Sequence, residues 1–481
     1  MVRSASEFID GLSDDRAVWV HGRKVDVTTY PPFAGSIQGM AGYFDWQTRF
    51  ADDCLVDNKA VGEVTNASLL IPRGPADLAA RHRAIDRLAR YSYGMLGRAP
   101  DYVNVTLSGF AARSDGFVVN GDRRYADRLE AYHREVARGD LSLTHALIHA
   151  TVDKAVGELE GQNRDLLTRV VRRTQEGVVV SGAKVLATLA PFSDELFVYP
   201  ALPLPPNAPP EVALVFSIPV STKGVKILCR DHCGVEAGLV DRPFSARFDE
   251  QDAFVIFDEV EIPHDRLFVD GDIEAYNNCG KFGWMSNILQ QTCIRAAVKL
   301  EFAYDLCAGM AKTLNAGKKP EVSSLLGELR SYGNLTRAAI TAGEANAYDH
   351  GNGAFFCDQA PLRAIKNLMP TWMQRANEII VAIGSHNLLC TPGAATLTDP
   401  EIGPLVERYL PGASGVSARD RNLIFRTAWD FAGSALGARV ALYEQYYLAS
   451  QPRNFSIEHA TAARESRENL LDSFLSELVA T

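Results

Sequence analysis

The sequence lacks the loops that usually bind nucleotide phosphates. No G-x-G-x-x-G follows a predicted strand and no G-x-x-x-x-G-K-[ST] occurs, so the chain has neither the common nicotinamide fingerprint nor a P-loop. It also has no H-E-x-x-H, no paired C-x-x-C and no G-x-S-x-G elbow. The commonest motifs of zinc enzymes and serine hydrolases are therefore absent. If the chain is an enzyme, we expect it to take its chemistry from a cofactor.

Long apolar runs and excess positive charge are also lacking. No stretch approaches the roughly 18 consecutive apolar residues that a membrane-spanning helix needs. The formal net charge is −10, which argues against nucleic acid or an anionic membrane surface as a partner, because phosphate binding depends on excess Lys and Arg. The eight cysteines are scattered, and residues 1–15 are polar and acidic, so we expect reduced thiols in a cytoplasmic protein.

What the sequence does have is a hydrophobic period that changes twice along its 481 residues. Residues 1–150 are predicted to form a mainly helical domain, in which Leu78, Ile85 and Leu88 share one helix face. Residues 151–272 are predicted to form a central β domain, because short apolar runs alternate there with Gly- and Pro-bearing breaks. Residues 273–481 are predicted to form a C-terminal helical bundle. The fold class is therefore α+β.

These patterns also predict individual elements. The expected strands are 170–188, as a hairpin that turns at Glu176-Gly177, followed by 195–200, 212–219, 225–229 and 253–260. The expected helices of the bundle are 282–314, 322–348, 360–384, 418–448 and 458–478. Pro370 should kink or interrupt the third of these helices.

One cluster, Cys229, His232 and Cys233, resembles a set of metal ligands. Its spacing allows two thiols and an imidazole to meet. However, the cluster lies at the end of a predicted strand and lacks a second ligand pair. We therefore predict no metal site.

Several separated motifs carry a family resemblance. They are Met95–Asn104, Leu143–Leu147, Gly182–Thr188 and Ala428–Gly437, and the stretch Ala253–Phe268 closes the β region. In this order they resemble the acyl-CoA dehydrogenase superfamily and, within it, the 4-hydroxyphenylacetate 3-monooxygenase oxygenase family. The resemblance runs nearly end to end and implies an N-terminal helical domain, a central antiparallel β-barrel-like domain and a C-terminal bundle that carries flavin and oligomer contacts.

The resemblance also implies an activity. A separate NAD(P)H:flavin reductase would supply reduced FAD, and this chain would use it with O2 to hydroxylate a para-substituted phenol ortho to its hydroxyl group. The absence of a nicotinamide loop agrees with that division of labour. The implied assembly is a homotetramer built as a dimer of dimers.

Three residues are implied to act on the phenol. Taken alone, Arg98 and Tyr102 would be a loop arginine paired with Asp101 and a tyrosine packed on the core. His145, in a helix start or loop, would be a core or surface histidine. The resemblance instead implies that Arg98 and Tyr102 contact the phenol oxygen and that His145 deprotonates the phenol, while Arg98 stabilises the phenolate.

A second set of residues is implied to line the flavin. Taken alone, Thr188 would be a strand threonine, and Gly433 and Gly437 would reflect tight helix packing, since each glycine costs a helix about 1 kcal/mol relative to alanine. By resemblance, the flavin-lining residues are His145, Ala146, Leu147, Thr151, Lys154, Thr188, Gly433, Ser434 and Gly437.

The chain departs from the family pattern at the para end of the substrate. Ala201 and Leu202 stand where the phenylacetate enzymes carry small hydroxyl residues, so we expect a different para substituent. The candidates are a phenylacetate-like compound, a tyrosine-derived compound or a halophenol, either free or presented by a carrier protein. His386 and the stretch 448–454 also depart from the pattern, which leaves flavin contacts and the pocket edge there open.

Three other functions remain open. A 4-hydroxybutyryl-CoA dehydratase would need cluster-binding thiolates in the region where this chain has Arg98 and Tyr102. An acyl-CoA dehydrogenase would need a carboxylate base in the C-terminal helices, for which Glu407 and Asp430 are candidates without supporting context. A non-catalytic flavin-binding protein is the third alternative.

Overall fold

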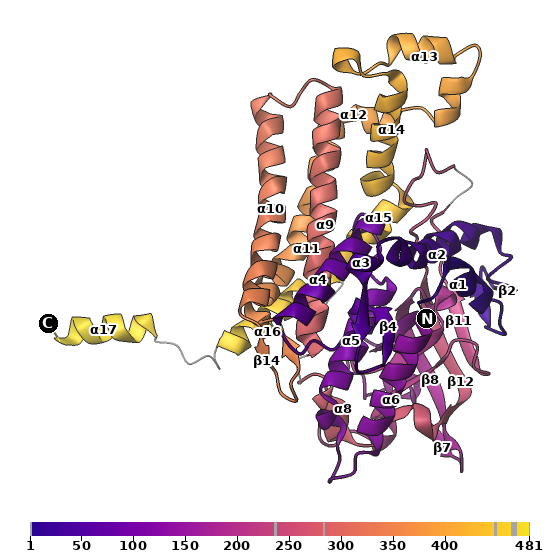
Figure 1. Cartoon of the computed structure of the whole chain (residues 1–481), viewed down its shortest axis with the longest axis vertical. Helices are drawn as coiled ribbons and strands as arrows, with labels where there is room; N and C mark the ends of the chain where they lie inside the picture. The colour runs from indigo at the N-terminus through magenta and orange to yellow at the C-terminus, as the bar shows by residue number, and fades with distance from the viewer. Residues whose placement is uncertain (1, 235–237, 282–283, 447–449, 463–468, 481) are drawn as a thin grey trace.

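A computed structural model describes residues 2–234, 238–281, 284–446, 450–462 and 469–480. Figure 1 shows upright C-terminal helices on one side, two sheets at the lower end, and N-terminal helices packed between them. The predicted fold class, with its order of helices, β region and helical bundle, is confirmed. In the described part of the chain, no helix is long and apolar enough to cross a membrane.

Three helices make up the expected N-terminal helical stretch. They are α4 (Pro75–Tyr91), α5 (Pro100–Ala112) and α6 (Arg124–Gly139). Both α4 and α5 begin at a proline, which suits the first helical position because the missing N–H would have no partner there. Every residue of α5 is buried, so α5 runs through the centre of the molecule. Three further helices precede them, α1 (Ala5–Gly11), α2 (Ala34–Arg49) and α3 (Ala51–Cys54).

The β region forms two main sheets. The seven-stranded sheet has the order β2-β1-β11-β12-β8-β6 with β7 added on β8, and the four-stranded sheet has the order β13-β10-β9-β5. The predicted hairpin is confirmed as β7 (Arg169–Arg173) and β8 (Gly177–Thr188). The other strands are β1 (Val18–Val20), β2 (Arg23–Val25), β5 (Leu143–Ala146), β6 (Ile148–His149), β9 (Glu195–Val198), β10 (Leu214–Pro219), β11 (Val225–Cys229), β12 (Asp252–Pro263) and β13 (Leu267–Asp270).

The antiparallel pairing expected within residues 151–272 is confirmed, but two strands from residues 1–150 join the sheets in parallel. Strand β1 pairs in parallel with β11, and β5 pairs in parallel with β9. Parallel partners need long crossover connections, so no local turn signal in the sequence marks these pairs. As a result, residues 1–150 contribute strands to both sheets.

The C-terminal bundle is built on three long helices, α9 (Trp284–Thr313), α10 (Pro320–Ala345) and α11 (Gln359–Gly384). Pro370 does not interrupt α11, which continues through it. The Gln451 side chain donates to the Asn367 carbonyl at 2.9 Å, supplying an outside donor next to the turn that the proline disturbs.

The predicted helix 418–448 is divided. It consists of α14 (Ala418–Ala428), a π turn at Trp429–Gly433, and α15 (Ala435–Tyr446). Residues 447–449 lie outside the described part. The predicted helix 458–478 corresponds to α16 (Gln451–Ala462) and α17 (Leu470–Ala480), and α17 stands clear of the body (Figure 1).

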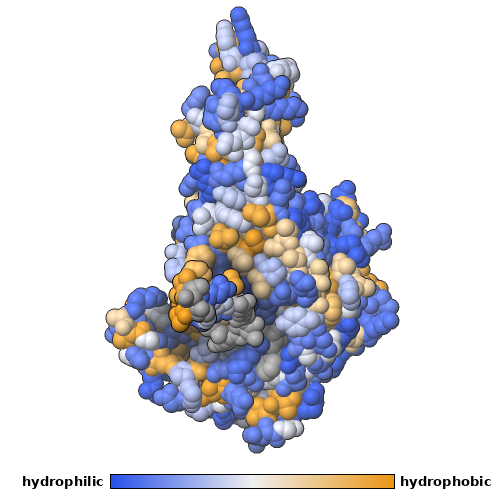
Figure 2. All heavy atoms as spheres, turned by 90° about the vertical axis from the view of Figure 1, so that its left-hand side faces the viewer, coloured by the Kyte–Doolittle hydropathy of each residue, from blue (hydrophilic) through white to orange (hydrophobic). Residues whose placement is uncertain are grey.

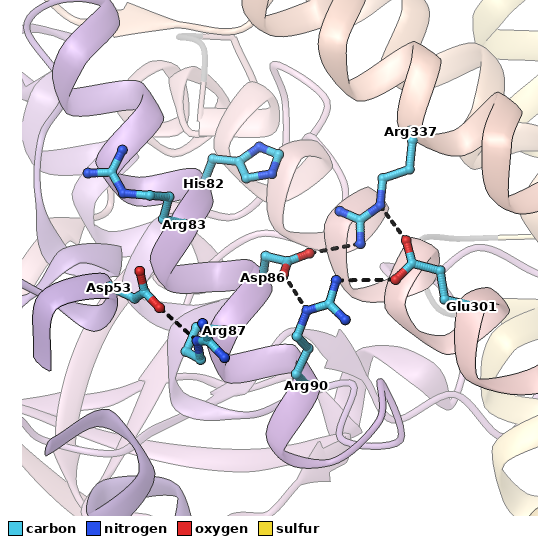
Figure 3. Close-up of a pocket in the computed structure, with 8 residues that line it drawn as sticks. All are labelled: Asp53, His82, Arg83, Asp86, Arg87, Arg90, Glu301 and Arg337. Atoms are coloured by element: carbon cyan, nitrogen blue, oxygen red, sulfur yellow. Dashed lines mark hydrogen bonds and ion pairs between the residues drawn. The ribbon is translucent and has the colours of Figure 1, made fainter. Parts of the chain in front are cut away.

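A ring of ion pairs joins α4 to the bundle. Around the ring, Asp86 and Arg90 of α4 are followed by Glu301 of α9 and Arg337 of α10, so that acidic and basic side chains alternate (Figure 3). The four nitrogen–oxygen distances are 2.6, 2.8, 2.7 and 3.2 Å. The ring lines a charged hollow of 340 Å³. Because the arginines there already face carboxylates, we interpret this hollow as a structural junction.

Candidate active site

The loop before α5 places Arg98 at the centre of the molecule. Pro100 holds Ala99 in an extended conformation (ψ 158°), as expected for a residue before proline. The backbone N–H of Arg98 donates to Glu250 Oε1 at 2.5 Å, and its side chain turns onto Tyr102, with the guanidinium carbon 3.9 Å from the ring centre. Asp101 is buried and accepts from Gln291 at 2.9 Å. Burial raises the pKa of Asp101 to about 6.

His145 lies in strand β5, so its predicted location in a helix start or loop was wrong. The reason is the parallel pairing of β5 with β9, where His145 faces Phe197. The His145 ring lies 5.4 Å from that of Tyr102, centre to centre. The structure therefore brings Arg98, Tyr102 and His145 together, although His145 lies more than 40 residues from the other two in sequence.

The electrostatic environment keeps His145 neutral. Burial, with the charge of Arg98 as the second cause, lowers the pKa of His145 well below its ordinary value of 6.5. Its Nδ1 atom is buried and has no hydrogen-bond partner among the described residues. An unsatisfied buried nitrogen of this kind is costly, so a polar group that enters the site would be favoured beside it.

Aromatic side chains surround this group, and sequence reasoning missed them. The ring centre of Tyr199, at the end of β9, lies 6.2 Å from that of His145 and 6.1 Å from that of Trp284. The ring centre of Phe110, in α5, lies 5.4 Å from that of Tyr199 and 5.5 Å from that of Trp284. Flat apolar walls around a few polar groups suit a planar aromatic ligand. No motif links these residues, since they meet only in the folded chain.

Thr188 ends strand β8 and is linked to Arg98 by a network of charged side chains. Its hydroxyl donates to Asp252 Oδ1 at 2.9 Å, and its carbonyl accepts from the Thr144 hydroxyl at 2.6 Å. Arg439 of α15 binds Asp252 and also Glu250, the acceptor for the Arg98 amide. Leu186, two residues before Thr188, has a left-handed φ of 62° and is 49% exposed, so an apolar side chain faces outward beside Thr188.

A buried lysine supports the segment that follows His145. Lys184 Nζ donates to the Leu147 carbonyl at 3.0 Å and lies 3.1 Å from His149 Nε2. Burial lowers the pKa of Lys184 to about 7, and burial together with Lys184 lowers that of His149 to about 2. Lys184 thus fixes the backbone between His145 and the loop beyond β6.

Other predicted residues lie outside the buried group. Ala146 is buried next to His145, but Thr151 and Lys154 bond each other in the loop after β6. Ala201 and Leu202 follow Tyr199 and are both exposed. The loop they occupy is held by Asn277, whose side chain makes two hydrogen bonds with the Leu204 backbone, at 2.8 and 2.9 Å.

The glycines near 435 are explained by contacts within the chain itself. A Cβ on Gly433 would lie 2.7 Å from the Trp429 ring, and one on Gly437 would lie 2.8 Å from the Ala432 carbonyl carbon. Ser434 is not helical (ψ 173°), so the helical stretch predicted across these residues is interrupted there, between the π turn and α15. The structure supports tight packing at both glycines, and a flavin contact there stays a prediction.

The candidate metal ligands meet other partners. His232 Nε2 lies 3.0 Å from the Ser36 hydroxyl, and Arg230 contacts the Cys233 sulfur at 3.4 Å. Burial raises the pKa of Cys229 to about 12 and that of Cys233 to about 11, so both thiols stay protonated near neutral pH. Within the described residues, no group of three or more His, Cys, Asp or Glu could hold a metal ion.

The comparisons with known proteins agree with this fold. A family model described as the 4-hydroxyphenylacetate 3-hydroxylase N terminal matches residues 4–269, and its C-terminal counterpart matches residues 277–476. The chain is 31% identical to the 4-hydroxyphenylacetate 3-monooxygenase oxygenase component of Thermus thermophilus, over 99% of this chain and 98% of the relative. A solved oxygenase component complexed with FAD and 4-hydroxyphenylacetate superposes with a TM-score of 0.92 at 30% identity, covering 99% of both chains.

A further relative carries a different substrate in its name. The chain is 30% identical, over 98% of its length and 89% of the relative, to a Streptomyces globisporus monooxygenase. That enzyme is named for a 3-amino-3-(3-chloro-4-hydroxyphenyl)propanoyl group on a peptidyl-carrier protein.

These matches define the class of the chain: a FAD-dependent monooxygenase with the fold of the 4-hydroxyphenylacetate 3-monooxygenase oxygenase components. Within that class, the chain belongs to the 4-hydroxyphenylacetate 3-hydroxylase family. The predicted family, the monooxygenase class and the FAD cofactor are thereby confirmed.

The alternatives lose support at particular residues. A 4-hydroxybutyryl-CoA dehydratase has a similar fold, with a TM-score of 0.88 at 20% identity, but this chain has Arg98 and Tyr102 in the region where we expected that chemistry to need thiolates. Asp430, one candidate base for an acyl-CoA dehydrogenase, is buried and accepts from the Phe244 and Ser245 amides at 2.8 and 2.9 Å. Glu407, the other candidate, is exposed on α13 (Gly403–Tyr409).

Proposed function

We propose that this chain is the oxygenase component of a two-component monooxygenase that hydroxylates a para-substituted phenol ortho to its hydroxyl group. The observation that carries the proposal is the meeting of Arg98, Tyr102 and His145 inside an aromatic enclosure. When bound, reduced FAD from a separate reductase supplies the activated oxygen. The chain's own task is to hold the phenol and make its ring electron-rich.

His145 is proposed to accept the phenol proton. Its pKa lies well below 6.5, so the imidazole is neutral and ready to accept a proton, although it is a weak base in isolation. Proton transfer becomes favourable because Arg98 stabilises the negative charge of the phenolate, and the phenolate in turn stabilises the new imidazolium. Burial also raises the pKa of Tyr102, although Arg98 opposes this, so Tyr102 remains a neutral donor to the phenol oxygen.

The flavin is proposed to lie against the other end of the site. The residues available to hold it are Thr188 at the end of β8, the His145–Leu147 segment, and the loop residues Thr151 and Lys154. The exposed Leu186 beside Thr188 offers an apolar surface that suits a flavin ring. Gly433, Ser434 and Gly437 remain candidate contacts at the C-terminal side.

The para pocket is proposed to be less polar than in the phenylacetate enzymes, because Ala201 and Leu202 carry no hydroxyl or charge. A product screen tests both the function and this pocket. The protein would be combined with FAD, NADH and a generic flavin reductase, and supplied with phenols that bear carboxymethyl, amino-acid, halide or carrier-bound para groups. Gain of one oxygen that depends on this chain supports the function. Peroxide as the sole product from every phenol would contradict it.

The assembly is proposed to be a cytoplasmic homotetramer that uses helices of the C-terminal region. Figure 2 views the molecule from the side on which α17 projects and shows hydrophobic residues gathered at that segment. The exposed apolar side chains of α17 are Leu470, Leu471, Phe474, Leu475, Leu478 and Val479. Such a surface is unfavourable in water unless another chain covers it. Native mass spectrometry of the full chain and of Phe474→Ser tests this, and we expect the variant to shift toward smaller species.

A further inference from the structure

Two buried carboxylates lie between the phenol end and the flavin end of the site, and one arginine binds both of them. Arg439 Nη1 donates to Glu250 Oε2 at 2.7 Å. The same guanidinium donates to Asp252 from Nε at 2.8 Å and from Nη2 at 2.6 Å. The three side chains are at most 13% exposed. These three hydrogen bonds are therefore shielded from water.

Each carboxylate reaches a different end of the site. Glu250 accepts the backbone N–H of Arg98 at 2.5 Å, so it fixes the residue proposed to hold the phenolate. Asp252 accepts the hydroxyl of Thr188 at 2.9 Å, so it fixes the strand end proposed to hold the flavin. Arg439 is thus linked to Arg98 through Glu250 and to Thr188 through Asp252.

The same helix also presses on the Arg98 loop through Tyr443, one turn after Arg439. The Tyr443 ring centre lies 4.7 Å from the Arg439 guanidinium carbon and 5.4 Å from that of Arg98. A Cβ on Gly97 would lie 2.4 Å from the Tyr443 hydroxyl, so the loop backbone lies directly against the ring. Helix α15 therefore reaches the Arg98 loop in two ways, directly through Tyr443 and indirectly from Arg439 through Glu250.

We infer that Arg439 is a positioning residue that couples the two ends of the site, so that bound flavin strengthens phenol binding. The inference rests on the proposed function, because it takes Arg98 as the phenol end and Thr188 as the flavin end. A shift of β8 on flavin binding would move Asp252, and the rigid fork of Arg439 would pass this movement to Glu250 and the Arg98 backbone. Coupling of this kind must act equally in both directions.

Lysine should not replace Arg439 in this role. An arginine fork binds two carboxylates at fixed angles, whereas an ammonium group is a single point charge on a flexible stem. Arg439→Lys keeps the charge that the two buried carboxylates need, and so preserves the fold, but loses the fixed geometry. Arg439→Met removes the charge as well, so Glu250 loses its arginine, whereas Asp252 keeps its ion pair with Arg230 at 3.0 Å.

Arg426 provides a matched control. It lies on α14 and pairs with Asp241 at 3.1 Å, so it also joins a C-terminal helix to a carboxylate of the chain that follows β11. Its contacts with the Asp241 carboxylate and the Asp241 carbonyl involve neither Arg98 nor Thr188. Arg426→Lys should therefore affect stability alone.

The test is calorimetric and needs no turnover. The affinity for 4-methylphenol would be measured anaerobically, with and without saturating reduced FAD, for the wild type and the variants. We expect reduced FAD to lower the Kd of the phenol by about 5- to 150-fold in the wild type, the usual range for coupled sites. The measured quantity is the Kd of the phenol without FAD divided by its Kd with reduced FAD. In Arg439→Lys and Arg439→Met this ratio should fall toward one, whereas Arg426→Lys should keep the wild-type ratio. Glu250→Gln serves as a further variant should both Arg439 substitutions prevent folding.

Two results would overturn the inference: a wild-type ratio of one, or a folded Arg439→Lys protein with the wild-type ratio. Either can occur while the wild type still hydroxylates phenols, and then only the coupling role fails. A wild type that binds no phenol and yields no hydroxylated product in the screen would instead overturn the proposed function itself.

Discussion

The guanidinium carbon of Arg98 lies 3.9 Å from the centre of the Tyr102 ring. This cation–π contact holds the arginine over the first turn of α5, and the centre of the His145 ring lies 5.4 Å from that of the same tyrosine. A cation fixed in place before the reaction costs no reorganisation when negative charge develops on the phenol. Substitutions at these residues, and in the scaffold that holds them, should therefore have separable effects.

Replacing Arg98 should weaken hydroxylation much more than flavin binding. In Arg98→Met the phenolate loses its cation, and we expect the rate constant for hydroxylation to fall about 100- to 1000-fold, as for loss of one oxyanion-stabilising donor. Arg98→Lys should recover only part of this loss, because an ammonium group does not stack flat on Tyr102. Single-turnover kinetics with pre-reduced FAD measure the effect. Equal rates in Arg98→Met and the wild type would remove Arg98 from the mechanism.

Adding one methyl group at position 97 should displace the Arg98 loop. The new Cβ of Gly97→Ala would lie 2.4 Å from the Tyr443 hydroxyl and 2.5 Å from the ring. Overpacking of this kind costs about 1–3 kcal/mol, so we expect a lower Tm and weaker phenol binding together. Gly327→Ala on α10 is the control, since nothing lies within 4 Å of its Cβ. It should stabilise the fold by up to about 1 kcal/mol.

Buried histidines should make the protein less stable as the pH falls from 7 to 5. Burial lowers the pKa of His133 from 6.5 to about 4. Below about pH 6.5, the unfolded chain therefore takes up a proton that the folded chain refuses, and the free energy of unfolding drops by about 2 kcal/mol per histidine by pH 5. Asp101 acts in the opposite direction, because burial raises its pKa to about 6.

The comparison of wild type with His133→Gln isolates the histidine contribution. Urea unfolding at pH 7 and pH 5 should show a smaller loss of stability in the variant, by about 2 kcal/mol. His133→Gln also loses the buried contact with the Leu69 carbonyl at 2.9 Å. This loss lowers the stability of the variant equally at both pH values, so it does not affect the comparison. An identical pH dependence in the two proteins would show that His133 takes up a proton in the folded state.

Much of the fold was predictable because it depends on local patterns. The Pro100 start of α5, the Glu176-Gly177 turn and the apolar period of α4 all act within a few residues, and the structure has each of them. The parallel pairing that places His145 in β5 depends on a strand about fifty residues further along the chain. No local signal in the sequence could have revealed it.

The site was predictable only in part, for a related physical reason. Arg98, Tyr102 and His145 belong to family motifs, and the structure brings them together. Glu250 and Arg439, by contrast, gain their significance only from a long-range ion pair. Arg439 lies two residues after Gly437 in the sequence, yet the contacts that explain Gly437 lie within the π turn and α15.

The most direct test of the central claim is a single turnover with ¹⁸O-labelled O2, comparing the wild type with His145→Ala. Each protein would be loaded with reduced FAD and the best phenol from the product screen, and the product would be analysed by mass spectrometry. We expect the wild type to place one labelled oxygen ortho to the hydroxyl group. At saturating reduced FAD, His145→Ala should form product about 100- to 10,000-fold more slowly, the usual range for loss of a general base. Equal labelled yield and rate in both proteins would contradict the role of His145, and the absence of label in the wild-type product would contradict the account as a whole.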